Sequence, residues 1–370
     1  MAQKNFLYIH IPFCKSKCLF CSFVIAVGKE HRTDAYLDAL AKEAGLYRGA
    51  ALETVYIGGG TPTFLSTDQL KRLFGIIKEN FTLADDAEIT IEANPENIEF
   101  EKATVLKSLG VNRISLGVQS LNEKYLQFLG RSHNVNDVHA AFEILRNTKF
   151  DNINLDLMFS FPGQSLDELT DDVEKITSFN SEHLSLYTLM IEEKSRFFAQ
   201  NIKLESGELR GRQYAHVVRL LEKKKFRQYE VSNFAKPQRE SRHNSIYWQG
   251  GNYIGLGVGA HSHSYGKRFW NVSSLMTYLS RLEKGESPVE DFERLTIEQQ
   301  FVETLLFGLR MIKGVDVYEL EKRFGWMLPE DKKGRLREFV KSGFLSDDGR
   351  RIKTTLKGRL ILDELCTRLV

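Results

Sequence analysis

The sequence predicts an α/β protein, in which a partial (β/α)6 barrel is followed by a C-terminal winged-helix-like domain. Two patterns carry this prediction. From Phe6 to about Leu189, short β-branched or apolar runs alternate with amphipathic helical stretches, which is typical of βα units around a parallel sheet. From about Thr296 onward, short helical stretches lead into a hairpin-like segment, which is typical of a helical domain with a wing.

The first segment, residues 1–190, contains six strand-like runs. They are Phe6–Pro12, Thr54–Gly59, Glu88–Asn94, Arg113–Gln119, Asn152–Phe159 and His183–Leu189. Amphipathic stretches separate them, and the one that follows Ser66 begins with a good N-cap residue. Six units are too few to close an eight-unit barrel, so we expect an open barrel whose chemistry lies on the loops after the strands.

The second segment, residues 191–290, has a different pattern. A long charged helix is expected around Glu208–Lys225, and a strand-like run follows over Gln228–Ala235. The glycine-rich stretch Gly250–Gly266 indicates tight turns. We expect this segment to extend the sheet and to cover the mouth of the barrel.

The third segment, residues 291–370, carries the winged-helix-like pattern. After the short helical stretches, an Asp-Asp-Gly turn at Asp347–Gly349 joins two strand-like runs, and a closing helix is expected over Leu356–Leu369. DNA-binding helices usually carry a surplus of basic residues, and the predicted third helix has none. A structural or partner-docking role is therefore favoured over DNA binding.

Composition limits the class of protein. The 370 residues are 42% hydrophobic and 27% charged, and the formal net charge is only +2, so the overall field gives no reason to expect a nucleic-acid partner. The first ten residues lack the pattern of a secretory leader, and no run of about 18 apolar residues is present. We expect a cytoplasmic protein.

The cysteines indicate a metal centre rather than disulfides. Cys14, Cys18 and Cys21 lie close together after the first strand-like run, and Cys366 stands alone. Thiolates are the usual ligands of iron–sulfur clusters, and three of them leave one iron of a four-iron cluster open to another ligand. The alternatives are inert thiols or a zinc site that His10 would have to complete.

Further candidate residues lie at or near the ends of the later strand-like runs. Glycines let a backbone approach a ligand, a carboxylate pairs with an ammonium group, an amide both donates and accepts, and a guanidinium holds a carboxylate. A carboxylate on a buried strand usually has a partner. Each residue alone is also compatible with an ordinary core or surface role. The candidates are Gly59, Gly60, Thr61, Glu92, Gln119, Arg131 and Asp156.

Taken together, these motifs resemble a known superfamily. The run Cys-Lys-Ser-Lys-Cys-Leu-Phe-Cys, over residues 14–21, resembles the radical S-adenosylmethionine signature. With Tyr8 and Phe20, the strand-end residues resemble the S-adenosylmethionine pocket of the oxygen-independent coproporphyrinogen oxidase family. The resemblance implies a [4Fe-4S] cluster whose open iron binds S-adenosylmethionine, and it extends over nearly the whole chain.

Within that family, the sequence resembles the haem-chaperone branch more than the oxidases. The oxidases carry a further cysteine two residues after the third, where this sequence has Phe23, and they have an N-terminal extension before the first strand. Residues 243–248 also resemble the HNxxYW motif associated with haem binding in that branch. The resemblance implies that His243 provides an imidazole to the haem iron and that Tyr247 and Trp248 contact the porphyrin.

A second pair of histidines leaves the haem ligand open. His261 and His263 would share a face on a strand, but a solvated turn is the favoured interpretation of this stretch.

The function expected from this resemblance is transfer of haem to acceptor proteins, including membrane-bound respiratory enzymes, by a protein that could form a homodimer. Whether the protein is also an enzyme stays open. The alternatives are the radical oxidase itself, a methyl or radical transferase, and a zinc-bound structural protein.

Overall fold

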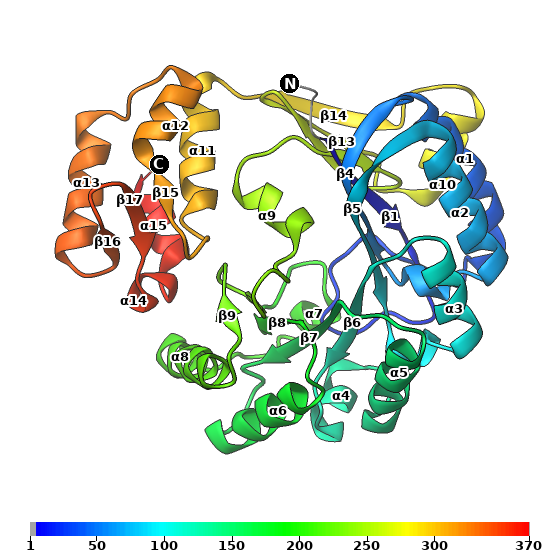
Figure 1. The fold of residues 1–370 in the computed structure, drawn as a ribbon, viewed down its shortest axis with the longest axis horizontal. Helices are drawn as coiled ribbons and strands as arrows, with labels where there is room; N and C mark the ends of the chain where they lie inside the picture. Colours follow the sequence, from blue (N-terminus) through cyan, green and yellow to red (C-terminus); the bar gives the residue numbers. More distant parts are fainter. Residues whose placement is uncertain (1–4, 370) are drawn as a thin grey trace.

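The computed structural model describes residues 5–369. Its centre is a nine-stranded sheet in the order β11-β1-β4-β5-β6-β7-β8-β10-β9 (Figure 1). The six predicted strands are present and neighbouring ones are parallel. They are β1 (Asn5–Ile11), β4 (Ala50–Gly59), β5 (Phe81–Ala93), β6 (Arg113–Gln119), β7 (Ile153–Phe159) and β8 (His183–Thr188). The predicted open (β/α)6 barrel is therefore confirmed.

Helices cover the outside of the barrel (Figure 1). Serine N-caps fix where two of them begin, because Ser66 forms a capping box with Gln69 and Ser165 forms one with Glu168. The covering helices are α1 (Thr33–Gly45), α2 (Thr67–Asn80), α3 (Phe100–Ser108), α4 (Glu123–Leu129), α5 (Val135–Asn147) and α6 (Leu166–Ser178). Short elements in the loops are β2 (Phe13–Cys14), β3 (Ala26–Val27), η1 (Glu30–Arg32), η2 (Pro62–Phe64) and η3 (Pro95–Asn97).

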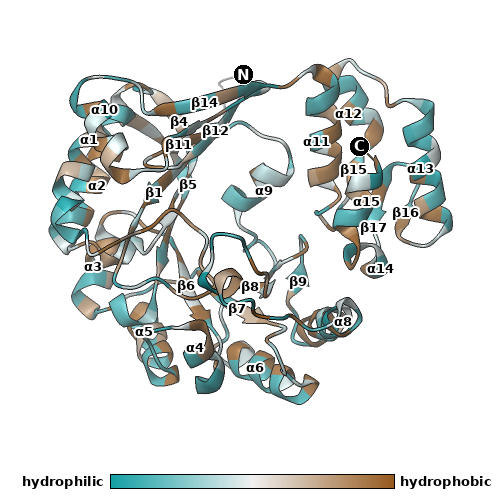
Figure 2. Cartoon of the chain, turned by 180° about the vertical axis from the view of Figure 1, so that it is seen from behind, coloured by the Kyte–Doolittle hydropathy of each residue, from teal (hydrophilic) through white to brown (hydrophobic). Residues whose placement is uncertain are grey.

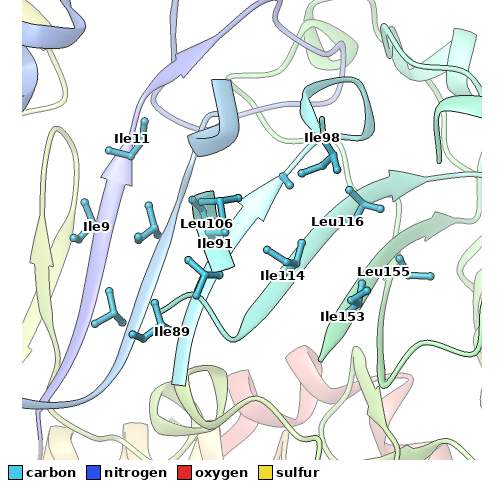
Figure 3. Close-up of a cluster of buried hydrophobic side chains, with 14 of the residues drawn as sticks. Ile9, Ile11, Ile89, Ile91, Ile98, Leu106, Ile114, Leu116, Ile153 and Leu155 are labelled. Atoms are coloured by element: carbon cyan, nitrogen blue, oxygen red, sulfur yellow. The ribbon is translucent and has the colours of Figure 1, made fainter. Parts of the chain in front are cut away.

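The two faces of the barrel sheet differ in chemistry because side chains alternate along a strand. Outward positions are aliphatic and pack under the helices (Figure 3), among them Ile9, Ile89, Ile91, Ile114, Leu116, Ile153 and Leu155. Inward positions on the same strands are polar or aromatic, among them Tyr8, Thr54, Tyr56, Glu92, Arg113 and Asp156. The interior of the barrel is thus suited to a polar ligand.

The second segment extends this sheet at both edges. It supplies β11 (Ile254–Leu256), which lies parallel to β1, and β10 (Asn233–Ala235), which lies antiparallel to β8 and pairs with β9 (Arg227–Gln228). A separate three-stranded sheet contains β12 (His261–Ser264), β13 (Lys267–Asn271) and β14 (Val289–Arg294). The helices are α7 (Arg196–Ala199), α8 (Gly207–Lys223), α9 (Arg242–Trp248) and α10 (Leu275–Glu283).

The expectation that this segment covers the mouth of the barrel is wrong for α9. This helix lies against Thr54 and Glu88, which are in the amino-terminal part of the barrel interior, below the layer that contains Arg113. The carboxyl ends of the strands, where the cysteine loop begins, are at the opposite edge. Helix α9 therefore closes the barrel from below.

The third segment forms a helical domain with its own hydrophobic core and a three-stranded wing in the order β15-β17-β16. Its elements are α11 (Ile297–Gly308), β15 (Val315–Asp316), α12 (Val317–Phe324), α13 (Glu330–Lys341), β16 (Leu345–Asp347), β17 (Arg351–Thr354), α14 (Leu356–Arg359) and α15 (Leu362–Leu369). The winged-helix-like architecture is confirmed. Figure 2 shows hydrophilic and hydrophobic positions on the helices of both domains, as expected for helices with one buried side.

The single closing helix predicted over Leu356–Leu369 is wrong, because the structure has two helices there. Gly358 lies within the first one and packs close to the wing, since a Cβ at this position would lie 2.0 Å from the carbonyl oxygen of Phe344. This close packing ties α14 to the wing, and the chain turns before α15 begins.

Among residues 5–369, the structure contains no helix that is both long and apolar enough to cross a membrane.

Candidate functional site

The loop after β1 carries the three clustered cysteines. Cys14 is buried in β2, and its Sγ atom lies 3.4 Å from the hydroxyl oxygen of Thr61. Cys18 and Cys21 are half-buried, and Arg131 donates from Nη1 to the Sγ atom of Cys18 at 3.5 Å. Burial raises the pKa of Cys14 to about 11 and also raises the pKa of Cys21. Metal binding must therefore displace thiol protons, as it does whenever thiolates are the ligands.

The surroundings of these thiols fit a [4Fe-4S] cluster. A Cβ on Gly60 would lie 2.8 Å from the Sγ atom of Cys14, so any side chain at position 60 would intrude on the thiol loop. Within residues 5–369, no three His, Cys, Asp or Glu side chains converge as they would around one metal ion. A four-iron cluster does not need such convergence, because each thiolate binds a different iron.

Glu92 lies at the carboxyl end of β5, next to the glycine loop. Its carboxylate accepts hydrogen bonds from the Tyr56 hydroxyl at 2.8 Å and from the backbone N–H of Gly59 at 3.0 Å. Burial raises the pKa of Glu92 to about 7. Tyr8 stacks on Tyr56 with 6.2 Å between the ring centroids. Glu92 is thus placed to meet an ammonium group at this edge and would become ionised when it does.

Arg131 is held beside the thiol loop by neutral acceptors. Its Nη2 atom donates to the Asn94 side-chain oxygen at 2.8 Å and to the Gly117 carbonyl oxygen at 3.0 Å. Its Nε atom is buried and has no hydrogen-bond partner among the described residues. An incoming carboxylate would satisfy that unpaired donor and the positive charge together.

The other predicted pocket residues line the same edge less directly. Gln119 ends β6 with a φ of 67°, a left-handed conformation that costs roughly 1–2 kcal/mol for a residue with a side chain. Asp156 accepts from Asn154 at 2.9 Å and from Ser115 at 3.1 Å, and burial raises its pKa. Phe20 packs on an apolar cluster beside the cysteine loop. The structure thus brings the predicted residues to one edge of the barrel.

Three residues of the barrel interior were not singled out by the sequence analysis: Tyr56, Asn94 and Arg113. Tyr56 and Asn94 contact Glu92 and Arg131, respectively. Arg113 is only 1% exposed, and its Nε and Nη2 atoms have no partner in the described chain. Alternation along a strand could have identified them, because all three occupy positions that face into the barrel.

The HNxxYW segment forms α9, with Ser241 as its N-cap. The Glu88 carboxylate accepts the backbone N–H groups of Arg242 and His243, each at 3.0 Å. His243 is 1% exposed, and both of its ring nitrogens are occupied, by the Thr54 hydroxyl at 2.6 Å and by the Tyr247 hydroxyl at 2.9 Å. Burial, assisted by the charge of Arg113, lowers the pKa of His243 to about 3, so its imidazole is neutral.

Trp248 points away from the barrel toward α11. The Arg310 guanidinium lies 4.4 Å from its ring centroid, and the Phe307 ring is 6.3 Å away. The structure therefore brings His243 and Tyr247 together but turns Trp248 to another side of α9. The assignment of these three residues to haem stays a prediction.

A cavity of about 570 Å³ lies between α9, the β12–β13 hairpin and helices α11 and α12. Aromatic residues line much of it, together with His263. The favoured interpretation of the His261–His263 stretch as a solvated turn is wrong, because both residues belong to β12. His263 faces the cavity, whereas His261 stacks on Trp270 with 5.8 Å between the ring centroids.

Comparisons with known proteins agree with this architecture. Residues 8–176 match the radical SAM superfamily, and residues 295–361 match the HemN C-terminal domain. The chain is 35% identical to the heme chaperone HemW of Bacillus subtilis over 367 residues, which cover 97% of each protein. It is 36% identical to the heme chaperone HemW of Lactococcus lactis over 363 residues, which cover 97% of this chain and 95% of that one.

A solved structure resembles the whole fold. It is the Escherichia coli coproporphyrinogen III oxidase HemN, a radical SAM enzyme, which is 26% identical with a TM-score of 0.87 and is matched over 100% of this chain and 90% of that chain. The near-complete coverage of the chaperones at a higher identity decides between the two branches. The cysteine loop and the barrel of this chain are those of the radical SAM superfamily, and the chain belongs to the HemW family of haem chaperones.

Proposed function

We propose that this protein is a haem chaperone, which binds haem and transfers it to acceptor proteins. The observation that carries the proposal is the similarity over 97% of the chain to proteins named for this activity. The structure supports it with an aromatic cavity beside the HNxxYW helix, on the far side of α9 from the barrel interior. In this proposal haem is the cargo that the protein passes on, whereas the iron–sulfur cluster is a resident cofactor.

The carboxyl edge of the barrel is proposed to hold the [4Fe-4S] cluster and S-adenosylmethionine. Cys14, Cys18 and Cys21 would ligate the cluster, and the lack of a side chain on Gly60 keeps the Cys14 thiol free of a steric clash. Glu92 would pair with the ammonium group and Arg131 with the carboxylate of the methionine moiety. When bound, this pair of cofactors supplies reductive radical chemistry. The remaining predicted contacts are those of Tyr8, Phe20, Gly59, Gly60, Thr61, Gln119 and Asp156.

The haem function is tested by anaerobic reconstitution of the cluster followed by titration with haem. A Soret band that shifts and saturates at a defined stoichiometry is expected. Mixing the loaded protein with an apo-haemoprotein should then move the spectrum to that of the acceptor. Absence of a saturable shift would refute haem binding, and a shift without transfer would reduce the protein to a haem binder.

The second candidate is the oxygen-independent coproporphyrinogen III oxidase, favoured by the TM-score of 0.87 to HemN. Phe23 stands where the oxidases have a further cysteine, and it is 67% exposed beside the thiol loop. Incubation of reduced, reconstituted protein with coproporphyrinogen III and S-adenosylmethionine distinguishes the two. We expect no protoporphyrinogen, and its stoichiometric or catalytic formation would replace the chaperone function with the oxidase.

We also propose that the acceptors include membrane-bound respiratory enzymes, that the carrier works in the cytoplasm and that it forms a homodimer. The support is the family resemblance. Sedimentation of the reconstituted protein, with and without haem, tests the dimer, and haem transfer to membranes that contain an apo-oxidase tests the acceptor.

A further inference from the structure

We infer that the cavity beside α9 is the haem site and that His263, rather than His243, is the ligand of the haem iron. The inference rests on the proposed chaperone function and adds the position of the cargo and the identity of the iron-binding nitrogen. It keeps Tyr247 and Trp248 of the HNxxYW motif as wall residues, since both line this cavity.

The size and lining of the cavity suit a flat, largely apolar ligand with a charged edge. Its volume of about 570 Å³ falls within the range of roughly 300–1,000 Å³ typical of cofactor sites. Six aromatic residues contribute to the wall: Tyr247, Trp248, Tyr253, Tyr265, Phe307 and Phe324. Aromatic faces bury a large apolar area against a porphyrin.

His263 is held as metal-binding histidines usually are. Its Nδ1 atom lies 3.0 Å from the carbonyl oxygen of Gly251. A carbonyl oxygen only accepts, so Nδ1 carries the proton and Nε2 keeps its lone pair for a metal. Within residues 5–369, no hydrogen bond is made to Nε2 of His263. Two backbone hydrogen bonds to Tyr253, of 3.0 and 2.9 Å, fix the position of the residue.

His243 is in the opposite situation. Both of its nitrogens are hydrogen-bonded, and its ring stacks on Tyr56 in the barrel interior at 5.1 Å between centroids. For His243 to bind iron, the bond from Nε2 to Tyr247 would have to break and α9 would have to leave the barrel. For His263 no bond has to break.

One charge at the cavity suits a ligand that carries a carboxylate. Arg323 donates to the backbone carbonyls of Gln249 at 3.0 Å and Gly250 at 2.8 Å, and no described carboxylate pairs with it. Its positive charge is therefore uncompensated. Arg268 also lines the cavity, but it is already paired with Glu293 and Glu303. A haem propionate directed toward Arg323 would gain a charge-assisted hydrogen bond.

The test compares matched histidine variants in haem titrations of the reconstituted full-length protein. His263→Asn keeps a side-chain N–H for Gly251 but removes the Nε2 ligand. His261→Asn is the control, since this residue lies two positions away on the same strand and stacks on Trp270 outside the cavity lining. We expect His263→Asn to lose the histidine-ligated signature in Soret and resonance Raman spectra and to bind haem at least about tenfold more weakly.

The outcomes separate this inference from the function on which it rests. Failure of the unaltered protein to bind haem would overturn both. Haem binding by the unaltered protein with the same spectrum and affinity in His263→Asn would overturn the inference alone. Return of the signature when free imidazole is added to His263→Asn would confirm it, since the ligand can then be replaced in an intact cavity. Circular dichroism of each variant establishes that it is folded.

Discussion

The carboxyl edge of the barrel and the cavity beside α9 differ in where their residues come from. Those of the edge lie between Tyr8 and Asp156, on successive parallel strands or in the segments that follow them, so one sheet positions them. The cavity is assembled from α9, the β12–β13 hairpin, α11 and α12, which belong to two domains. In our proposal, the edge holds the cofactors that are shared by a superfamily, whereas the cavity holds the haem that this family carries.

The two regions also differ in how they use charge. At the edge, ionisable groups are buried, and burial raises the pKa of Glu92 to about 7 and that of Cys14 to about 11. In the cavity, aromatic surface dominates and the cation of Arg323 is at its border. If the regions are independent, damage to one should leave ligand binding at the other intact.

The largest expected effect is the loss of the cluster in Cys18→Ala. Two remaining thiolates leave two irons without a protein ligand, so iron and acid-labile sulfide should fall to background after anaerobic reconstitution. Haem titration of the same variant should be unchanged, because the cavity contains none of the thiol loop. Cys366→Ala is the control, since this cysteine lies in α15 and should have no effect on iron content. Loss of haem binding in Cys18→Ala would show that the regions are coupled.

His243→Ala should destabilise the fold while leaving the haem ligand in place. Removal of the imidazole leaves a cavity and deprives the buried hydroxyls of Thr54 and Tyr247 of a partner, which together cost about 3 kcal/mol. Denaturant unfolding measures the loss, and the Soret spectrum of the folded variant should match that of the unaltered protein. If His243→Ala lost the histidine signature but kept its stability, His243 in α9 would be the ligand of the haem iron.

Glu92→Gln should abolish a pH dependence of S-adenosylmethionine binding. With its pKa near 7, the free carboxyl is protonated below that pH and must release a proton to pair with an ammonium group. Affinity should therefore fall up to about tenfold for each pH unit below 7 in the unaltered protein, and Glu92→Gln should bind more weakly at all pH values without this slope. Calorimetry in buffers of different ionisation enthalpy measures the proton released.

Glu43 provides the control for this measurement. Burial also raises its pKa to about 7, but it lies in α1 and is bonded to Tyr278 and to the backbone of Gly257 rather than to a residue of the proposed S-adenosylmethionine pocket. Glu43→Gln should therefore keep the proton release. For both acids the raised pKa stabilises the fold below about pH 4.5, and that contribution is lost as the pH rises to about 7. If the pH dependence of the affinity persisted in Glu92→Gln, the ammonium group would be bound by another residue.

The barrel edge could be predicted from the sequence because strand ends are readable. Strand-like runs followed by a glycine, a carboxylate or an amide placed Gly60, Glu92 and Gln119 at one edge, since parallel strands end together. The partners that fix their geometry were harder to identify. Tyr56 and Asn94 lie within runs whose inward parity is visible only once the outward face is known.

The cavity could not be predicted because no local pattern spans it. His263 and Gly251 are twelve residues apart, and their hydrogen bond depends on the pairing of β12 with the backbone of Tyr253. Phe307 and Arg323 come from the winged-helix-like domain, whose docking on α9 is a tertiary event. The motif did identify α9, but the inward turn of His243 follows from the contacts with Thr54 and Glu88, which are distant in sequence.

The smallest effect expected is that of Arg323→Gln, and it examines the charged border of the cavity. An exposed charge pair contributes at most about 1 kcal/mol, so haem affinity should fall only about three- to fivefold. Screening weakens such pairs, so the difference from the unaltered protein should shrink as salt is raised from about 0.05 to 0.5 M. Lys322→Gln, which makes the same charge change one residue earlier in α12 but lies outside the cavity lining, should bind haem normally. A salt-independent loss in Arg323→Gln would instead indicate that the carbonyls of Gln249 and Gly250 had moved, because a packing defect is not screened.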